Sequence, residues 1–158
     1  MCKDGQLEFR DYCSRIVRQE GGDSEWIRIP RYRCNNPGCR KLHRILPDIL
    51  VPYKHYQEEV IADSLDGRIS PSDSDDRPSE QTVKNWNHWL MFNALNIDGH
   101  MKSVGHRELG FSEELLRSSV LPLESLRRSI PEGWLKAILC KIYNSGDRLW
   151  PFYQHSFY

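Results

Sequence analysis

Cys34 and Cys39 are separated only by Asn-Asn-Pro-Gly, and His43 follows Cys39 after a further short segment. Thiolate and imidazole are the preferred ligands of zinc, which often binds them as short, turn-linked pairs. A Pro-Gly turn reverses the backbone and can bring the two sulfur atoms together. The stretch therefore predicts a zinc knuckle at the joint between two halves of the chain. The alternative is a surface turn with two ordinary cysteines.

Two segments rich in β-forming residues precede this stretch. Residues 7–17 and 26–32 contain many aromatic and β-branched side chains, and a loop with Gly21 and Gly22 separates them. This pattern predicts a β-hairpin whose second strand leads into Cys34. A zinc ribbon has the same layout, with one ligand pair before the first strand and one after the second. The predicted Zn²⁺ ligands are Cys2, Cys34, Cys39 and His43, with Cys13 in reserve.

The first position of that ligand set is incomplete, since Cys2 has no second cysteine beside it. A water molecule or a neighbouring chain can also complete the coordination of the metal. Alternatively, zinc is absent and packing alone holds the knuckle. A bound metal would help to stabilise a small hydrophobic core, and only 39% of the residues are hydrophobic.

Charge is distributed unevenly along a chain whose formal net charge is zero. Residues 1–57 hold eleven Lys and Arg against seven Asp and Glu, whereas residues 58–80 hold two against eight. The basic first part is compatible with a phosphate-bearing partner. The hairpin arginines are Arg10, Arg15, Arg18, Arg28, Arg31 and Arg33. They form either a solvated sheet face or a face that contacts phosphates.

The second half of the chain is predicted to be helical. After an irregular, proline-interrupted linker over residues 42–53, apolar residues recur at helical spacing over 53–66 and again over 79–95. An acidic loop separates these two segments, and the arrangement resembles a helix-turn-helix with a long connection. The exposed side of the second helix would carry Lys84, Asn85 and His88. Such side chains read bases in the major groove, but they are equally common on any solvated helix.

Further helices are predicted over residues 111–120, 122–130 and 134–143, followed by a strongly aromatic tail over 149–158. The tail is either a strap across the helical core or an exposed anchor for a partner. The predicted fold class is therefore α+β. We expect a zinc-ribbon-like hairpin over residues 1–46 and a helical domain over 47–158. The helical domain contains the helix-turn-helix-like segment (53–95), the C-terminal helices (111–146) and the tail.

Several of these segments carry a resemblance to a known family. They are Leu7–Tyr12, Ile29–Cys34, Leu46–Tyr56 and Gly133–Lys136, with a looser match at Val83–Trp86. Together they resemble an uncharacterised bacterial family of the DUF6431 type, whose members are short, transposase-like and found near mobile elements. The resemblance implies a zinc ribbon, a helix-turn-helix-like segment and DNA binding without a nuclease core. The chain departs from the family pattern in lacking an initial Cys-x-x-Cys pair and in its loop with Asp73, Asp75 and Asp76, which would repel phosphates.

An enzyme is not expected. Metal-dependent transposases need three carboxylates around two metal ions, and the spacing of Asp48, Asp63 and Asp98 does not suggest such a frame. We expect a non-enzymatic, zinc-binding nucleic-acid-binding protein of a mobile genetic element, acting as a transposase-like accessory protein or regulator. The predicted nucleic-acid-binding residues are Arg28, Arg31, Arg33, Lys84, Asn85 and His88.

Two other functions fit the same sequence. In the first, a phage or mobile-element protein uses an acidic loop to imitate phosphates and inhibits a host defence nuclease, as anti-CRISPR proteins do. The predicted partner-binding residues are then Asp73, Asp75, Asp76, Trp150, Phe152 and Tyr153. In the second, the aromatic tail forms a homodimer. The polar N-terminus, the lack of a long apolar run and the clustered cysteines predict a cytoplasmic protein with reduced thiols.

Overall fold

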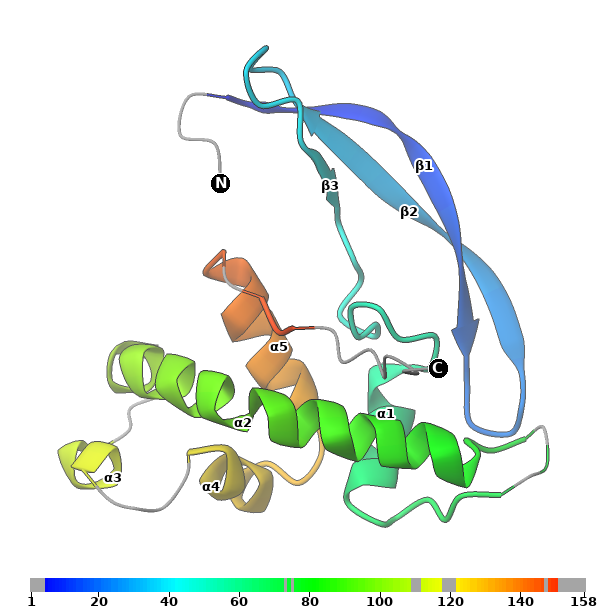
Figure 1. Ribbon diagram of the computed structural model, residues 1–158, viewed down its shortest axis with the longest axis vertical. Coiled ribbons are helices and arrows are strands. Elements are labelled where there is room, and N and C mark those ends of the chain that lie inside the picture. Colours follow the sequence, from blue (N-terminus) through cyan, green and yellow to red (C-terminus); the bar gives the residue numbers. More distant parts are fainter. Residues whose placement is uncertain are drawn as a thin grey trace, which may run out of the picture.

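The N-terminal part of the chain forms an antiparallel sheet, and helices follow it, so the protein is α+β as predicted (Figure 1). The computed structural model describes residues 5–72, 74, 76–108, 112–117, 122–146 and 148–150. The strands are β1 (Leu7–Arg18), β2 (Ser24–Cys34) and β3 (Leu42–Arg44), arranged in the order β1-β2-β3. The helices are α1 (Glu58–Leu65), α2 (Glu80–Glu108), α3 (Glu113–Arg117), α4 (Pro122–Ser129) and α5 (Trp134–Asn144).

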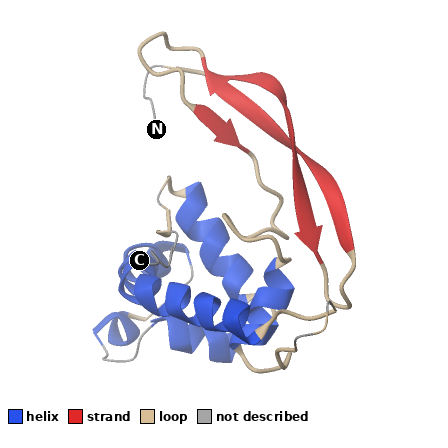
Figure 2. Cartoon of the chain, turned by 45° about the vertical axis from the view of Figure 1, so that its right-hand side comes forward, coloured by secondary structure: helices blue, strands red, loops and turns tan. Residues whose placement is uncertain are grey.

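Strands β1 and β2 form a long, curved ribbon that arches away from the helices (Figures 1 and 2). Its turn contains Gly21 and Gly22 with φ angles of 88° and 84°, a backbone region that favours glycine. A β-bulge between Phe9 and Asp11 leaves Arg10 without a partner across the ribbon. On the side facing the helices, Val17 and Ile29 pack with Leu50 in a small core.

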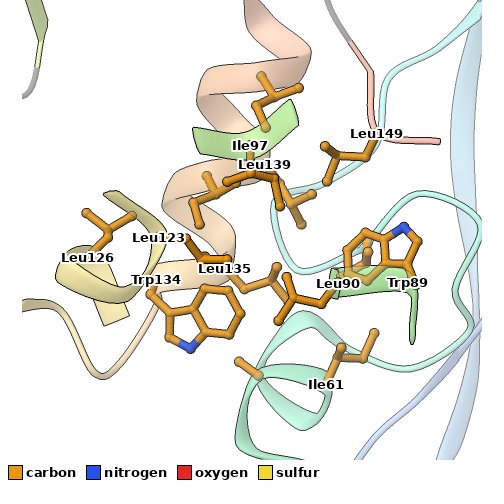
Figure 3. Close-up of a cluster of buried hydrophobic side chains, with 14 of the residues drawn as sticks. Ile61, Trp89, Leu90, Ile97, Leu123, Leu126, Trp134, Leu135, Leu139 and Leu149 are labelled. Atoms are coloured by element: carbon orange, nitrogen blue, oxygen red, sulfur yellow. The ribbon is translucent and has the colours of Figure 1, made fainter. Parts of the chain in front are cut away.

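The main core lies among the helices and is built from apolar side chains that are distant in sequence. Ile61 of α1, Trp89 of α2 and Trp134 of α5 are all buried in it (Figure 3). Leu149, which follows α5, is also buried in this cluster. The helices thus stabilise one another through a shared core, whereas the sheet has its own smaller one.

Three sequence-based expectations about local structure were wrong: the irregular linker, the start of α1 and the end of α2. The predicted linker contains β3, which pairs with β2 through Tyr32 and His43. Helix α1 begins at Glu58 rather than at residue 53, because Tyr53 adopts a positive φ of 65° and Gln57 forms a β-bridge with Leu50.

Helix α2 does not close near residue 95 but continues to Glu108. Its buried stripe also continues, through Ile97, Met101 and Val104. Gly99 lies within this helix and is exposed, so the helix tolerates it. Burial of the apolar stripe outweighs the low helical propensity of one glycine, which amounts to about 1 kcal/mol.

Main-chain hydrogen bonds attach the sheet to the rest of the molecule at one end of the ribbon. Arg18 N donates to His55 O at 2.8 Å, and Gln57 N donates to Arg18 O at 2.9 Å. At the ribbon turn, Gly21 N donates to Asp76 O at 3.1 Å. The opposite end of the ribbon carries the cysteine turn. Among the helices that the structure describes, none has the length and apolar character needed to cross a membrane.

Candidate nucleic-acid interface

The register of the ribbon sorts its side chains onto two faces of different chemistry. Paired residues of antiparallel strands point to the same face, and successive residues point to opposite faces. The inner face, toward the helices, contains the pairs Glu8–Arg33, Asp11–Arg31, Cys13–Ile29 and Val17–Glu25. All three carboxylates of the described strands therefore lie on the inner face. The outer face carries Phe9, Tyr12, Trp26, Arg28 and Tyr32.

Aromatic side chains on the outer face contact one another and an arginine. The ring centroids of Phe9 and Tyr12 are 5.1 Å apart, and those of Phe9 and Tyr32 are 5.8 Å apart. The Arg28 guanidinium lies 4.4 Å from the centroid of the Tyr12 ring. Trp26 is 70% exposed, Phe9 52% and Tyr12 49%. We refer to Phe9, Tyr12, Trp26, Arg28 and Tyr32 as the outer platform.

The arginines predicted to bind nucleic acid do not lie together. Arg28 is on the outer platform, whereas Arg31 and Arg33 lie on the inner face. Arg31 Nε donates to Asp11 Oδ1 at 2.6 Å, and this hydrogen bond holds the pKa of the Asp11 carboxyl below its usual value. Arg31 is therefore already paired with a carboxylate. Arg33 Nε is a buried atom with no hydrogen-bond partner.

The predicted recognition residues of α2 lie near the start of that helix and already have partners there. Lys84 Nζ forms an ion pair with Glu80 at 2.8 Å, and Asn85 accepts a hydrogen bond from Gln81 at 3.0 Å. His88 is exposed one turn further along. These side chains belong to α2, whereas the outer platform belongs to β1 and β2, so the predicted binding residues are divided between the two parts of the molecule.

The chain reverses between β2 and β3 through residues 34–41, which we call the cysteine turn. Cys39 N donates to Asn36 O at 2.9 Å, and Cys34 N donates to Lys41 O at 2.9 Å. Arg40, directly after Cys39, adopts a left-handed φ of 50°. The N-terminal segment passes close to Cys34, since a Cβ atom on Gly5 would lie 2.3 Å from Cys34 Sγ. Cys34 is therefore buried, with the N-terminal segment lying against it at Gly5.

The predicted metal ligands are only partly within the part of the chain that the structure describes. Cys2 lies outside it, and among the described residues no three His, Cys, Asp or Glu side chains gather around one point. By register His43 shares a face with Tyr32 and Cys34, whereas Cys13 shares the inner face with Ile29. The register therefore favours His43 over the reserve ligand Cys13. Cysteine and histidine donors of this kind suit Zn²⁺.

The residues of the alternative, partner-binding hypothesis are also only partly described. Asp73, Asp75, Phe152 and Tyr153 lie outside the described residues. The Asp76 carboxylate accepts a hydrogen bond from the Ser74 hydroxyl, and the Asp76 main-chain carbonyl accepts one from Gly21 N of the ribbon turn. Trp150 is half-exposed, but its main chain is fixed by two hydrogen bonds with the Asn93 side chain.

The fold and this face define an α+β protein with a basic, aromatic sheet surface joined to a helical body. The chain belongs to the family described as Domain of unknown function (DUF6431), which matches residues 1–86. The match includes the whole sheet, the cysteine turn, α1 and the beginning of α2. No curated protein and no solved structure matches the chain.

Sequence reasoning identified the aromatic residues of the strands but not the surface that they form. Trp26, Arg28 and Tyr32 are separated by even numbers of residues along β2, so the alternation of side chains along a strand predicts that they share a face. Phe9 and Tyr12 have opposite parity, so a regular strand would place them on opposite faces. The bulge at Arg10 brings them to the same face. Nothing in the sequence locates that bulge.

Proposed function

We propose that this protein is a non-enzymatic nucleic-acid-binding protein and that the outer platform is its principal contact surface. The observation that carries the proposal is the sorting of charge by the sheet register. Every carboxylate of the described strands is on the inner face, and the outer face has Arg28 among exposed aromatic side chains. Phosphates are attracted to an arginine without nearby carboxylates, and they are repelled where carboxylates lie close.

Arg28 is the best-placed phosphate contact of the predicted set. Its guanidinium lies over Tyr12, which orients it by a cation–π interaction, and the residue is exposed. Arg31 is less suited, since it would have to leave Asp11. Lys84 would have to leave Glu80, although that exposed pair is weak and can break at little cost. The same proposal includes a role for this protein in a mobile element, as a transposase-like accessory protein or regulator.

A salt titration of binding to labelled duplex and single-stranded DNA tests this function. The Arg28→Ala variant is expected to weaken binding several-fold and to lower the salt slope by about 1, as expected for the loss of one phosphate contact. Arg128→Ala is the matched control, because Arg128 is an exposed arginine on α4 with a helical partner, Glu124. It removes the same charge at a distant place and should leave affinity nearly unchanged.

Absence of binding to either form of DNA at low ionic strength would reject the proposal. Equal losses in the two variants would also contradict it, because they would indicate a general effect of net charge rather than a contact at the platform. If neither form of DNA binds, the function to test becomes binding of a protein partner through Asp76 and Trp150.

Zinc binding at the cysteine turn is part of this proposal, with Cys2, Cys34, Cys39 and His43 as ligands. The closed turn and the passage of Gly5 beside Cys34 support it. When bound, zinc would fix the turn and the N-terminal segment in one arrangement. Because four protein ligands leave no open coordination position, the zinc would have a structural role.

Metal content of the purified protein tests this proposal directly. We expect about one equivalent of zinc per chain, lost in Cys34→Ser and Cys39→Ser, whereas Cys13→Ser retains it. A native protein that holds well below about one third of an equivalent would exclude a structural zinc site. Retention of full zinc content in both Cys34→Ser and Cys39→Ser would exclude this ligand set.

A further inference from the structure

We infer that the outer platform binds single-stranded nucleic acid, with unpaired bases stacked on Phe9, Tyr12, Tyr32 and Trp26 and the backbone beside Arg28. This inference rests on the proposed function and specifies the ligand of the same surface. Base stacking needs exposed aromatic faces next to positive charge, and the outer platform provides both. The described part of the structure has no element covering it, as the exposure of Trp26 and Phe9 indicates.

The platform is long enough for several nucleotides. Residues on one face of a strand repeat about every 7 Å, so the span from Trp26 to Tyr32 is roughly 20 Å. Phe9 and Tyr12 are tilted by 60° to each other, and Phe9 and Tyr32 by 79°. Because these rings are not stacked face to face, they do not cover one another's faces, and the Phe9 face is open to a base. The Arg28 guanidinium lies over the Tyr12 ring, so a base stacked on the neighbouring rings would have its phosphate close to this positive charge.

Duplex DNA is a poorer ligand for this surface. A two-stranded ribbon can enter the major groove, but it reads bases there through donors and acceptors on its outward side chains. The outer platform has one such strong donor group, that of Arg28, and its other members are bulky rings. In a duplex the base faces are already covered by neighbouring bases, so the rings gain little. An unpaired strand exposes those faces.

Fluorescence anisotropy with one labelled oligonucleotide, alone and annealed to its complement, tests the inference. We expect the single strand to bind at least about tenfold more tightly than the duplex. Phe9→Leu and Tyr12→Leu should each weaken single-strand binding about tenfold, in line with the loss of one stacked base, and leave duplex binding nearly unchanged. Phe9→Trp, which keeps a ring, should retain affinity.

Phe92→Leu is the matched control, because Phe92 is an exposed phenylalanine on α2, apart from the sheet. It should not change binding. A second readout is tryptophan fluorescence, since Trp86, Trp89 and Trp134 are buried and Trp26 is the most exposed tryptophan of the described residues. Single-stranded DNA should quench part of the emission, and Trp26→Phe should remove that quenching.

The outcomes separate this inference from the proposed function. Binding that is equally strong for duplex and single strand, or that persists in Phe9→Leu and Tyr12→Leu, overturns the stacking inference while leaving nucleic-acid binding intact. No binding to either form overturns both. Capture of a protein partner that depends on Phe9 and Tyr12, without nucleic-acid binding, would assign the platform to protein recognition instead.

Discussion

At the scale of single residues, a few positions are fixed by close contacts that their neighbours impose. Gly5 is one, because any side chain there meets Cys34 Sγ. Asp98 is another. It is a nearly buried carboxylate whose Oδ1 accepts a hydrogen bond from Leu123 N at 2.9 Å, while Oδ2 has no partner. Each contact has a measurable consequence for stability.

Gly5→Ala is expected to lower the free energy of unfolding by about 1–3 kcal/mol, since the new Cβ would overlap Cys34 Sγ and force a main-chain shift. Gly99→Ala is the matched control. It lies within α2 with open space around its Cα, so it should raise the free energy of unfolding by about 0.5–1 kcal/mol. Urea denaturation measures both. An unchanged Gly5→Ala variant would mean that the N-terminal segment does not lie against Cys34.

Asp98→Asn is expected to stabilise the protein at pH 7 by about 1 kcal/mol and to have little effect at pH 3. Burial raises the pKa of the Asp98 carboxyl above its ordinary value of 3.8. Because folding raises the pKa, the contribution of this carboxyl to stability is greatest below pH 3.8, where it is protonated in both states. This contribution is lost as pH rises through the folded-state pKa and the buried carboxyl ionises. Asparagine keeps an acceptor for Leu123 N and lacks this dependence.

Urea denaturation of both proteins between pH 3 and pH 7 checks this expectation. The difference in the free energy of unfolding between Asp98→Asn and the native chain should grow with pH. A constant difference would show that the Asp98 pKa is not raised by folding.

At the scale of elements, helix α2 holds the segment after α5 through one buried side chain. Asn93 is 1% exposed, its Nδ2 donates to Trp89 O and Trp150 O, and its Oδ1 accepts from Trp150 N at 2.8 Å. Both polar main-chain groups of Trp150 are thereby satisfied. Leu149, the preceding residue, is buried in the main core. The first part of the aromatic tail is therefore a strap, whereas residues 151–158 lie outside the described residues.

Asn93→Ala is expected to lower the free energy of unfolding by about 2–4 kcal/mol, because the partly buried main-chain groups of Trp150 would lose their partner and a cavity would form at the buried Asn93 site. Asn96→Ala is the matched control on the same helix, where the side chain makes one long, exposed hydrogen bond to Arg148 O at 3.4 Å. It should cost less than about 0.5 kcal/mol. Thermal or urea denaturation distinguishes the two, and equal effects would contradict the strap.

At the scale of the whole molecule, Asp66 connects helices that are distant in sequence. It follows α1 and accepts hydrogen bonds from Arg127 Nε of α4 at 2.9 Å and from Trp134 Nε1 of α5 at 2.9 Å. Arg68 also approaches it, at 3.2 Å. A single carboxylate thus fixes how α1, α4 and α5 meet at the edge of the main core.

Asp66→Ala is expected to lower the free energy of unfolding by about 3 kcal/mol, since the partly buried donors Arg127 Nε and Trp134 Nε1 would lose their acceptor, although Arg127 keeps its hydrogen bond to Leu65 O. Asp63→Ala is the control, because Asp63 pairs only with the nearby Arg68 among the described contacts and should cost less than about 1 kcal/mol. Nucleic-acid affinity of the folded fraction should not change in either variant. A large loss of affinity in Asp66→Ala would place part of the binding surface on the helices.

The predicted and observed bounds of the helices and strands show which features a local sequence pattern can predict. The apolar stripes of α2, α4 and α5 and the glycine turn of the ribbon predict their elements, because helical and strand periodicity and turn preferences act over a few residues. The start of α1 and the strand β3 were missed, since both depend on pairing with segments distant in sequence. Leu50 pairs with Gln57, and Tyr32 with His43.

The sequence by itself determined the α+β class, the order of the hairpin and the helices that follow it, and the presence of aromatic residues, arginines and clustered cysteines near the N-terminus. Only the tertiary structure decided which of them share a surface. The bulge at Arg10 brings Phe9 and Tyr12 to one face, and the register places Asp11 against Arg31 on the other. Strand pairing acts across the chain and a one-residue shift inverts both faces, so residue order alone cannot assign them.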